Sequence, residues 1–525
     1  MRQLLSRRRS TLVAQTVLLT SGVRASTPEL SPAVPYAVYT PPNHYTPPGV
    51  GVELLQVVLI HRHGDRAPIS QSAGAAVVCD PDHWADRLPA ESELSSWATF
   101  HPVRGPAVVA DAGEEPFGQL TRLGAQQCYA LGAALRSSLE TYAPHLLPVN
   151  NTKAETCASA EGAEALAERE EGSGGDAGGG VVAVATNIRR TQQSVQNVLR
   201  GLLAPTPTVR VPVAVRELDD EVLIPRPSQC AALQQRMDAL RAAQKEALAP
   251  RTPSSGGATD RRFNASLEAR AAATLQYEDG ALRLDQAREV LVCLVAHGDA
   301  LPPGISVDDV LTLSSLNIER WTEIYRDRTV ARLSVGRLLH ALEGHLVSAA
   351  SRAPAAPKVV LLSGHDSSLV PLLAALDVFD HPEWPPYAAD IRVELGTAPD
   401  TALGTGLGDP AGEGVGAAAD PKANAVSVVR MLYLGRPLPL AAAIRASSDA
   451  GATAASTVGG VAEAGWVPLA AFQALVAPLA CTDETHRLAC QTTAADEASA
   501  GSGDTSLQDT LVAQTRGRMP TPDAP

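Results

Sequence analysis

Three ionisable residues, Arg62, His63 and Arg66, follow an apolar run in the stretch 54–68, LLQVVLIHRHGDRAP. The run is short and rich in β-branched residues, which predicts a strand buried on both faces. Ligands of open α/β sheets bind at the carboxyl ends of strands, where these side chains would emerge. A neutral imidazole can attack phosphorus, and guanidinium groups bind phosphate oxygens in a bidentate geometry. The stretch therefore predicts a phosphate site with His63 as nucleophile, whereas isolated charged residues of this kind more often mark a solvated strand end.

A second apolar run, KVVLLSGHD at 358–366, ends in His365 and Asp366, where a helix is predicted to begin. A helix N-terminus has free backbone N–H groups and a partial positive charge, so it favours a phosphate oxyanion. His365 can donate a hydrogen bond to that oxyanion. Asp366 can be a simple N-cap, or it can protonate the departing alkoxide and later activate the water that cleaves a phosphohistidine.

The stretch RHGDRAP at 62–68 resembles the RHGxRxP signature of the histidine acid phosphatases, the second branch of the histidine phosphatase superfamily. The His-Asp pair resembles the pair that follows a later strand in that family. The segment TNIRRTQQ resembles the family segment that supplies a third phosphate-binding arginine. This resemblance gives that role to Arg190, with Arg189 as the adjacent competitor.

The resemblance implies a phosphate monoester hydrolase that uses no metal and no other cofactor. Its catalytic residues would be His63 and Asp366, and its phosphate-binding residues Arg62, Arg66, Arg190 and His365. A neutral imidazole and a protonated carboxyl group make opposite demands on pH, which the family meets with an acidic optimum.

Beyond the general family, the segment FDHPEWPPYAAD at 379–390 resembles the group of lysophosphatidic acid phosphatase type 6, and the resemblance extends over residues 50–490. It implies that the partner is a small-molecule phosphate monoester, namely lysophosphatidic acid or a related lipid phosphate. A phytase-like phosphatase acting on inositol phosphates is the enzymatic alternative. A non-catalytic phosphate-binding protein on the same fold is the alternative from a different class.

The elements that must position these residues alternate between strands and helices. Apolar runs predict strands at 54–63, 181–186 and 358–362, and later strands are predicted at 390–395 and 426–434. Helical periodicity covers 119–142, with Thr121 as the expected N-cap, and the segments after residues 186 and 366. The pattern indicates an α/β fold. The resemblance implies a three-layer sandwich with a mixed, mainly parallel central sheet and an inserted α-helical cap domain.

The chain divides by composition into five parts. We expect a targeting segment and Pro-rich lead-in at 1–45, the first part of the α/β core at 46–205, a mostly helical cap at 206–350, the second part of the core at 351–491 with a disordered insertion at 397–425, and a disordered tail at 492–525. Within these parts, Trp384 and Tyr387 are expected to pack structurally, and His297 to be a hydrogen-bonded structural residue. Asp65 receives no role.

A formal net charge of −14 argues against nucleic acid as a partner, so the arginines near the motif must form a local positive pocket. No stretch approaches the roughly 18 unbroken apolar residues of a transmembrane segment. We expect a soluble monomer. The amino terminus is rich in Arg, Ser and Thr, with no acidic residue before Glu29, which favours a mitochondrial transit peptide over a secretory signal that would lead to secretion or to the endomembrane lumen.

The seven cysteines show no CxxC or other metal-binding spacing, so zinc is not expected. Their odd number leaves at least one free thiol. Cys481 and Cys490 are near enough in sequence to pair.

Overall fold

The computed structural model describes residues 45–69, 80–97, 116–147, 180–204, 211, 213–217, 220–248, 267, 270–271, 284–399, 425–447 and 464–491. The expected targeting segment up to residue 44, the insertion from 400 to 424 and the tail from 492 lie outside these ranges. Within the described ranges, no helix has both the length and the apolar character needed to cross a membrane.

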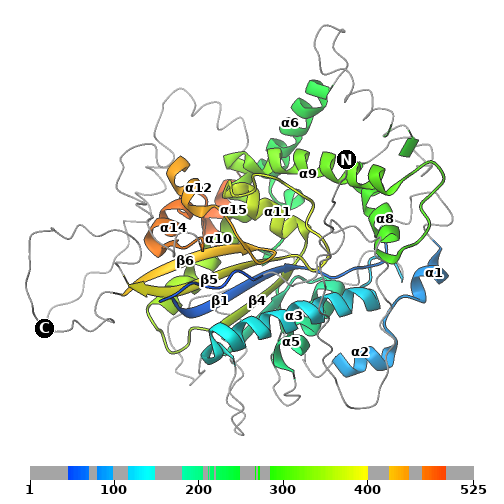
Figure 1. Ribbon diagram of the computed structural model, residues 1–525. Coiled ribbons are helices and arrows are strands. Elements are labelled where there is room, and N and C mark those ends of the chain that lie inside the picture. The colour runs from blue at the N-terminus through cyan, green and yellow to red at the C-terminus, as the bar shows by residue number, and fades with distance from the viewer. Residues whose placement is uncertain are drawn as a thin grey trace, which may run out of the picture.

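A mixed sheet runs through the middle of the molecule (Figure 1). Its strands are β1 (Glu53–Arg62), β2 (Val181–Ala185), β3 (Val213–Val215), β4 (Val359–Gly364), β5 (Asp390–Pro399), β6 (Ala425–Tyr433), β7 (Arg436–Pro437) and β8 (Val467–Pro468). The order is β3-β2-β4-β1-β5-β6-β7, and β8 pairs with β6. Strands β3, β2, β4 and β1 are parallel to one another, and the pairings beyond β1 are antiparallel. The predicted α/β class and mixed sheet are confirmed.

Strand β1 is buried on both faces, as its apolar run predicts. Val57 and Leu59 point into the apolar cluster on one face, and Val58 and Ile60 into the cluster on the other face. This alternation follows from the two-residue period of a strand. The motif therefore extends from the centre of the core rather than from its edge.

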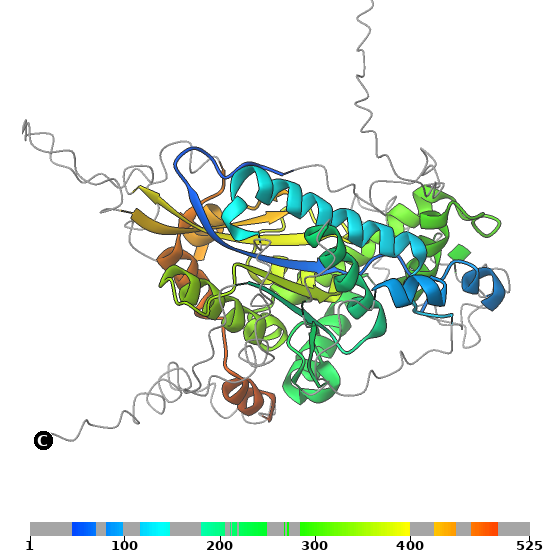
Figure 2. The ribbon, with the colours of Figure 1, turned by 90° about the horizontal axis from the view of Figure 1, so that it is seen from below.

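Helices α3 (Arg122–Tyr142) and α5 (Arg189–Leu203) cover one face of the sheet, and Figure 2 shows this layer toward the viewer. Thr121 is the N-cap of α3, because its side chain accepts a hydrogen bond from the N–H of Gly124. The N-cap prediction is confirmed. The apolar face of α3 packs on the sheet through Leu131, Leu135 and Leu139.

The opposite face is covered by a second helical layer, which completes the predicted three-layer sandwich. It contains α10 (Arg328–Ala350), α11 (Asp366–Ala375), α12 (Leu440–Ser447) and α14 (Leu469–Val476), while α15 (Asp483–Gln491) packs on α10. The apolar stripe of α10 is buried here through Val335, Leu338, Leu339, Leu342 and Leu346.

The helices α6 (Ala231–Leu248), α8 (Leu284–His297) and α9 (Val307–Arg326) come from the range predicted as a cap. Helix α8 packs on α9, and α9 packs on α11 (Figure 1). Two other elements of this range belong to the layered body, because β3 pairs with β2 and α10 packs against β1 and β5. The expected cap at 206–350 is thus interrupted. The remaining short elements are α1 (Pro81–Ala85), α2 (Glu91–Trp97), η1 (Pro144–Leu146) and η3 (Pro227–Gln229).

Strand β5 is longer than predicted. It continues to Pro399, which pairs with Ala425 of β6, so residues 397–399 belong to the sheet and not to the expected disordered insertion. Backbone pairing across the β5–β6 ladder extends the strand past the residues whose side chains alternate in polarity.

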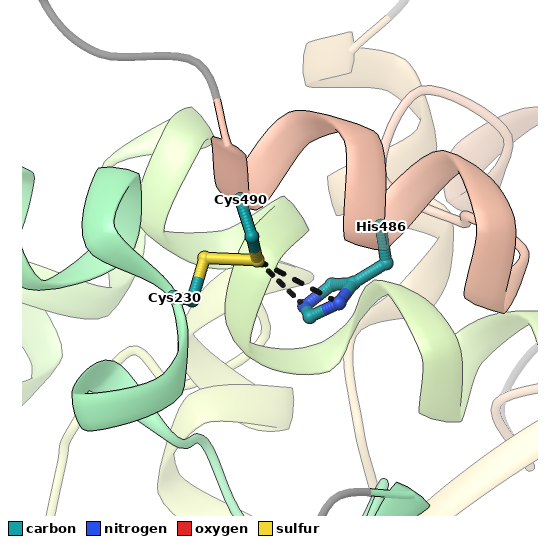
Figure 3. A group of neighbouring side chains, drawn as sticks. All are labelled: Cys230, His486 and Cys490. Atoms are coloured by element: carbon teal, nitrogen blue, oxygen red, sulfur yellow. Dashed lines mark hydrogen bonds between the residues drawn. A yellow bond between two sulfur atoms is a disulfide. The ribbon is translucent and has the colours of Figure 1, made fainter.

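The disulfide is not the Cys481–Cys490 pair that nearness in sequence allows. Cys230, just before α6, forms a disulfide with Cys490 of α15, across a sequence separation of 260 residues (Figure 3). Cys481 instead is a buried free thiol whose backbone N–H donates to the carbonyl of Gly336, which holds it against α10. His486 lies beside the disulfide, with both ring nitrogens 3.7 Å from Cys490 Sγ.

Candidate active site

The two predicted motifs meet at the carboxyl edge of the sheet. Strands β1 and β4 are parallel neighbours, with Arg62 in register with Gly364. The N–H of His63 donates to the carbonyl of Gly364 at 2.9 Å, so His63 and His365 leave adjacent strand ends. Strand β2 lies on the other side of β4 and leads into Arg190 at the start of α5. Three segments far apart in sequence thus converge where α/β sheets bind ligands.

Two glycines let the motif loop pack directly on α3. A Cβ on Gly64 would overlap the backbone of Gly124, and a Cβ on Gly124 would overlap the backbone of Asp65. The N–H of Gly64 donates to Ser194 Oγ at 3.1 Å, and the N–H of Asp65 donates to Gln127 Oε1 at 2.8 Å. Helices α3 and α5 therefore fix the backbone that carries the motif side chains.

The ring of His63 is buried and its tautomer is set by a backbone carbonyl. Nδ1 lies 2.7 Å from the carbonyl oxygen of Gly64, which can only accept, so Nδ1 carries the proton. Nε2 then has the lone pair that a nucleophile needs. Burial, followed by the positive charges of Arg190 and Arg62, holds the pKa of His63 well below its usual range. The imidazole therefore stays neutral in mildly acidic solution.

Arg62 and Arg66 are buried beside His63. The guanidinium of Arg62 lies 4.3 Å from the ring centre of Tyr387 and donates to the carbonyl of Pro385 at 2.6 Å. The Nε atoms of Arg62 and Arg66 are buried and have no hydrogen-bond partner among the described residues. Buried donors are normally satisfied, so such atoms indicate a site built for an acceptor, such as a phosphate oxygen.

Arg190, rather than its neighbour Arg189, is the third arginine of the site. Arg190 is buried, whereas Arg189 is partly exposed. Nη1 of Arg190 lies 3.4 Å from the carbonyl of Gly118, and after burial its charge is the leading cause of the low pKa of both His63 and His365. Of the two residues that the resemblance left in competition, Arg190 is the buried one and its charge acts on both imidazoles.

His365 stands next to His63, with their ring centres 5.4 Å apart. Its Nε2 lies 3.0 Å from Thr186 Oγ1, which lies 2.7 Å from Thr191 Oγ1. The single hydroxyl proton of Thr191 points to the carbonyl of Ile188 at 2.7 Å, so Thr191 accepts from Thr186 and Thr186 in turn accepts from Nε2 of His365. The proton of the neutral His365 ring therefore sits on Nε2. Burial, then Arg190, holds the pKa of His365 well below its usual range.

Asp366 is the first residue of α11, and His365 occupies the N-cap position. The simple N-cap alternative for Asp366 is therefore wrong. Its Oδ2 forms an ion pair with Arg62 Nη2 and accepts a hydrogen bond from Trp384 Nε1, both at 3.1 Å. Burial alone would raise the pKa of this carboxyl group, but the charges of Arg62 and Arg288 outweigh burial and lower the pKa to about 2.

Comparison with known proteins places this site in a family. A scan against models of known protein families finds no match. Among solved structures, the apo phytase of Hafnia alvei aligns with a TM-score of 0.46 and 15% identity, covering 85% of this chain and 100% of the phytase chain.

The chain is 28% identical over 290 residues to lysophosphatidic acid phosphatase type 6 of Pongo abelii, covering 53% of this chain and 56% of that relative, little more than half its length. It is 30% identical over 359 residues to testicular acid phosphatase of Homo sapiens, covering 65% of this chain and 67% of that relative. The chain belongs to the histidine acid phosphatase family.

Four further residues of this histidine acid phosphatase site were not predicted as site residues. Trp384 and Tyr387 are buried, as expected, but they also contact Asp366 and Arg62. The aromatic residues of the WPPY segment, directly before β5, were the available signal. Arg288 and Glu289 of α8 had no such signal, because an isolated charged pair in a helix is ordinarily solvated.

Arg288 is a buried cation on the cap side of the site. Its guanidinium stacks 4.0 Å from the ring centre of Trp384, and its Nε donates to Ser314 Oγ at 2.9 Å. Burial, then repulsion from Arg62, lowers the pKa of Arg288 to about 9. Arg288 therefore adds a further positive charge to the site, and this charge acts on Asp366.

Asp65, the variable position of the motif, joins the motif loop to the cap of this histidine acid phosphatase. Its buried Oδ2 accepts from Thr121 Oγ1 at 2.5 Å and from His297 Nε2 at 2.6 Å. Burial alone would lower the pKa of His297, but the charge of Asp65 and its hydrogen bond raise it above the usual value. The prediction of a hydrogen-bonded structural role for His297 is confirmed.

Proposed function

We propose that this protein hydrolyses phosphate monoesters through a phosphohistidine on His63. The observation that carries the proposal is the placement of the His63 Nε2 lone pair among three buried arginines, with Asp366 on the neighbouring strand end. Nε2 attacks phosphorus while the ester oxygen leaves with the proton of Asp366. A water molecule then cleaves the phosphohistidine after Asp366 removes its proton, which restores both residues.

The charges around His63 suit a phosphate dianion. Arg62, Arg66 and Arg190 bind its oxygens, and His365, once protonated beside the bound dianion, donates a further hydrogen bond from Nδ1. Preorganised donors in a buried site stabilise the charge of the transferring phosphoryl group without reorganising during the reaction.

The substrate is proposed to be lysophosphatidic acid or a related lipid phosphate. The support is the sequence similarity to proteins named lysophosphatidic acid phosphatase type 6. A panel of p-nitrophenyl phosphate, lysophosphatidic acid and inositol hexakisphosphate checks this choice with one purified sample. Faster release from inositol hexakisphosphate than from lysophosphatidic acid would favour the phytase-like alternative.

The decisive test of the reaction is the His63→Ala variant assayed with p-nitrophenyl phosphate. Turnover should disappear while the far-UV circular dichroism spectrum stays that of the wild type. His340→Ala is the matched control, because His340 is exposed on α10. A fully active His63→Ala variant would eliminate the mechanism. A wild-type protein that binds phosphate yet releases none from any ester would instead be a non-catalytic phosphate-binding protein.

Mitochondrial import is proposed from the basic, Ser- and Thr-rich start of the chain. The Cys230–Cys490 disulfide supports the alternative of an oxidising secretory compartment. A fusion of residues 1–40 to a fluorescent reporter separates the two, since entry into the secretory route would overturn the mitochondrial proposal.

A further inference from the structure

Helix α8 places an acidic side chain, Glu289, in a site that is otherwise built from cations. Arg66 Nη1 donates to Glu289 Oε1. The same oxygen accepts a second hydrogen bond, at 2.7 Å, from the backbone N–H of Ile69, just after the motif. Two donors therefore hold Glu289 Oε1 against the motif loop.

The other carboxylate oxygen of Glu289 is in a different situation. Oε2 is buried and has no hydrogen-bond partner among the residues that the structure describes. The side chain as a whole is 15% exposed, although Oε2 itself is buried. A buried carboxylate oxygen without a donor is unfavourable, which indicates that a donor arrives with a ligand.

The face of α8 that carries Glu289 lies next to the nucleophile. Cys293, one turn further along α8, has its Sγ 3.4 Å from the hydroxyl of Tyr387. The Tyr387 ring centre is 6.1 Å from that of His63, and the guanidinium of Arg62 stacks on the same ring. Arg66 contacts both Glu289 and Cys293. Glu289 therefore lies against Arg66, one of the candidate phosphate-binding arginines, on the side contributed by the cap.

Building on the proposed phosphatase function, we propose that Glu289 is a specificity residue with two effects on the alcohol part of the ester. Oε2 accepts a hydrogen bond from a free hydroxyl group next to the ester, and the negative charge of the carboxylate repels a second phosphate at that place. The substrate class that fits is a polyol monophosphate with a hydroxyl group near the ester and no adjacent phosphate.

A matched series of two-carbon esters isolates these effects. The probes are 2-hydroxyethyl phosphate, ethyl phosphate and ethane-1,2-diyl bisphosphate, which differ only in the second substituent. The wild type should show a kcat/KM roughly 10-fold higher for the hydroxyethyl ester than for the ethyl ester, since a hydrogen bond to a charged group has about this effect. The bisphosphate should be the poorest of the three substrates.

Glu289→Gln tests the assignment to this residue. The amide keeps an oxygen for Arg66 and Ile69 but removes the charge and replaces the free acceptor with a donor. The hydroxyethyl-to-ethyl ratio should fall several-fold, because the hydroxyl group then meets a neutral amide in place of a charged acceptor, and the bisphosphate should gain about 10-fold relative to the ethyl ester. The control is Glu319→Gln, on the exposed side of α9, which should keep the wild-type ratios.

Each outcome decides one question. Equal wild-type rates on the hydroxyethyl and ethyl esters would overturn the specificity proposal, whatever the variant does. An equal loss on all three esters in Glu289→Gln would show that Glu289 only anchors Arg66. If the wild type turns over none of the three esters and no p-nitrophenyl phosphate, the proposed phosphatase function fails, and the specificity proposal fails with it.

Discussion

Nη2 of Arg62 lies 3.1 Å from Oδ2 of Asp366, so the cation assigned to phosphate binding is also the ion partner of the assigned proton donor. This pair, with the charge of Arg288, lowers the pKa of Asp366 to about 2 in spite of burial. A phosphate dianion bound to Arg62 would offset that positive charge and bring a like charge close to the carboxylate, and both effects raise a carboxyl pKa. Substrate binding therefore favours the protonated form that the leaving group needs.

Replacing the proton donor should discriminate between leaving groups. In Asp366→Asn, the amide cannot protonate an alkoxide, so kcat for an alkyl phosphate should fall by about 10²–10⁴-fold. The p-nitrophenolate group leaves without protonation, so kcat for p-nitrophenyl phosphate should fall much less. Steady-state kinetics with both esters measure the difference. Equal losses would mean that Asp366 acts on the phosphate or on the fold rather than on the leaving group.

The neutral state of His63 should depend on Arg190. Burial and then Arg190 keep the pKa of His63 low, so in the wild type the ring remains neutral and nucleophilic as the pH falls below 6.5. In Arg190→Met the pKa of His63 should rise toward its ordinary value. The acid limb of the kcat/KM profile should then move to higher pH, in addition to weaker phosphate binding. The adjacent change Arg189→Met is the control and should leave the profile in place. If the acid limb moves in Arg189→Met and not in Arg190→Met, then Arg189 is the residue that keeps the pKa of His63 low.

The pair of Asp65 and His297 should make stability depend on pH. Because the folded pKa of His297 is raised, its contribution to the free energy of unfolding is complete below 6.5 and is lost as the pH rises through the folded pKa. The melting temperature of the wild type should therefore decline over that window. His297→Gln should flatten the decline and destabilise the fold by about 3 kcal/mol at low pH, since it removes the charge that faces the buried Asp65.

The control variant His340→Gln should retain the wild-type slope of melting temperature against pH. Calorimetry at several pH values measures both, and a slope that persists in His297→Gln would assign the dependence to another group.

The core of the site was predictable because each motif is local in sequence and follows a buried strand. An apolar run determines that a strand is central, and the residues after it must then emerge at the carboxyl edge, which is how His63, Arg62 and Asp366 came together. The family resemblance supplied the third arginine. The pairing of β1 with β4, and the register that places Arg62 beside Gly364, are findings of the structure.

The site residues that the sequence did not predict are placed by packing between segments that are far apart in the sequence. Whether Glu289 meets Arg66 is decided by how α8 packs on the motif loop, and a helical charge looks the same in sequence whether it faces solvent or a buried cation. The cysteines show the same limit. Proximity in sequence suggested Cys481 and Cys490, whereas the packing of α15 beside α6 brought Cys230 to Cys490.

The contact of Gly124 with the motif loop gives a prediction with a sharp control. A Cβ on Gly124 would overlap the backbone of Asp65, and backbone cannot move aside as a side-chain tip can. Gly124→Ala should therefore destabilise the fold by about 1–3 kcal/mol. Because the displaced loop carries His63, kcat should also fall by about 100-fold, the effect of a displacement near 1 Å. In Gly344→Ala, the Cβ added at this exposed position of α10 meets no atom within 4 Å, so the helix should gain up to about 1 kcal/mol with activity unchanged. Denaturant unfolding and p-nitrophenyl phosphate turnover measure the two effects, and a Gly124→Ala variant as stable and active as the wild type would show that the loop can yield.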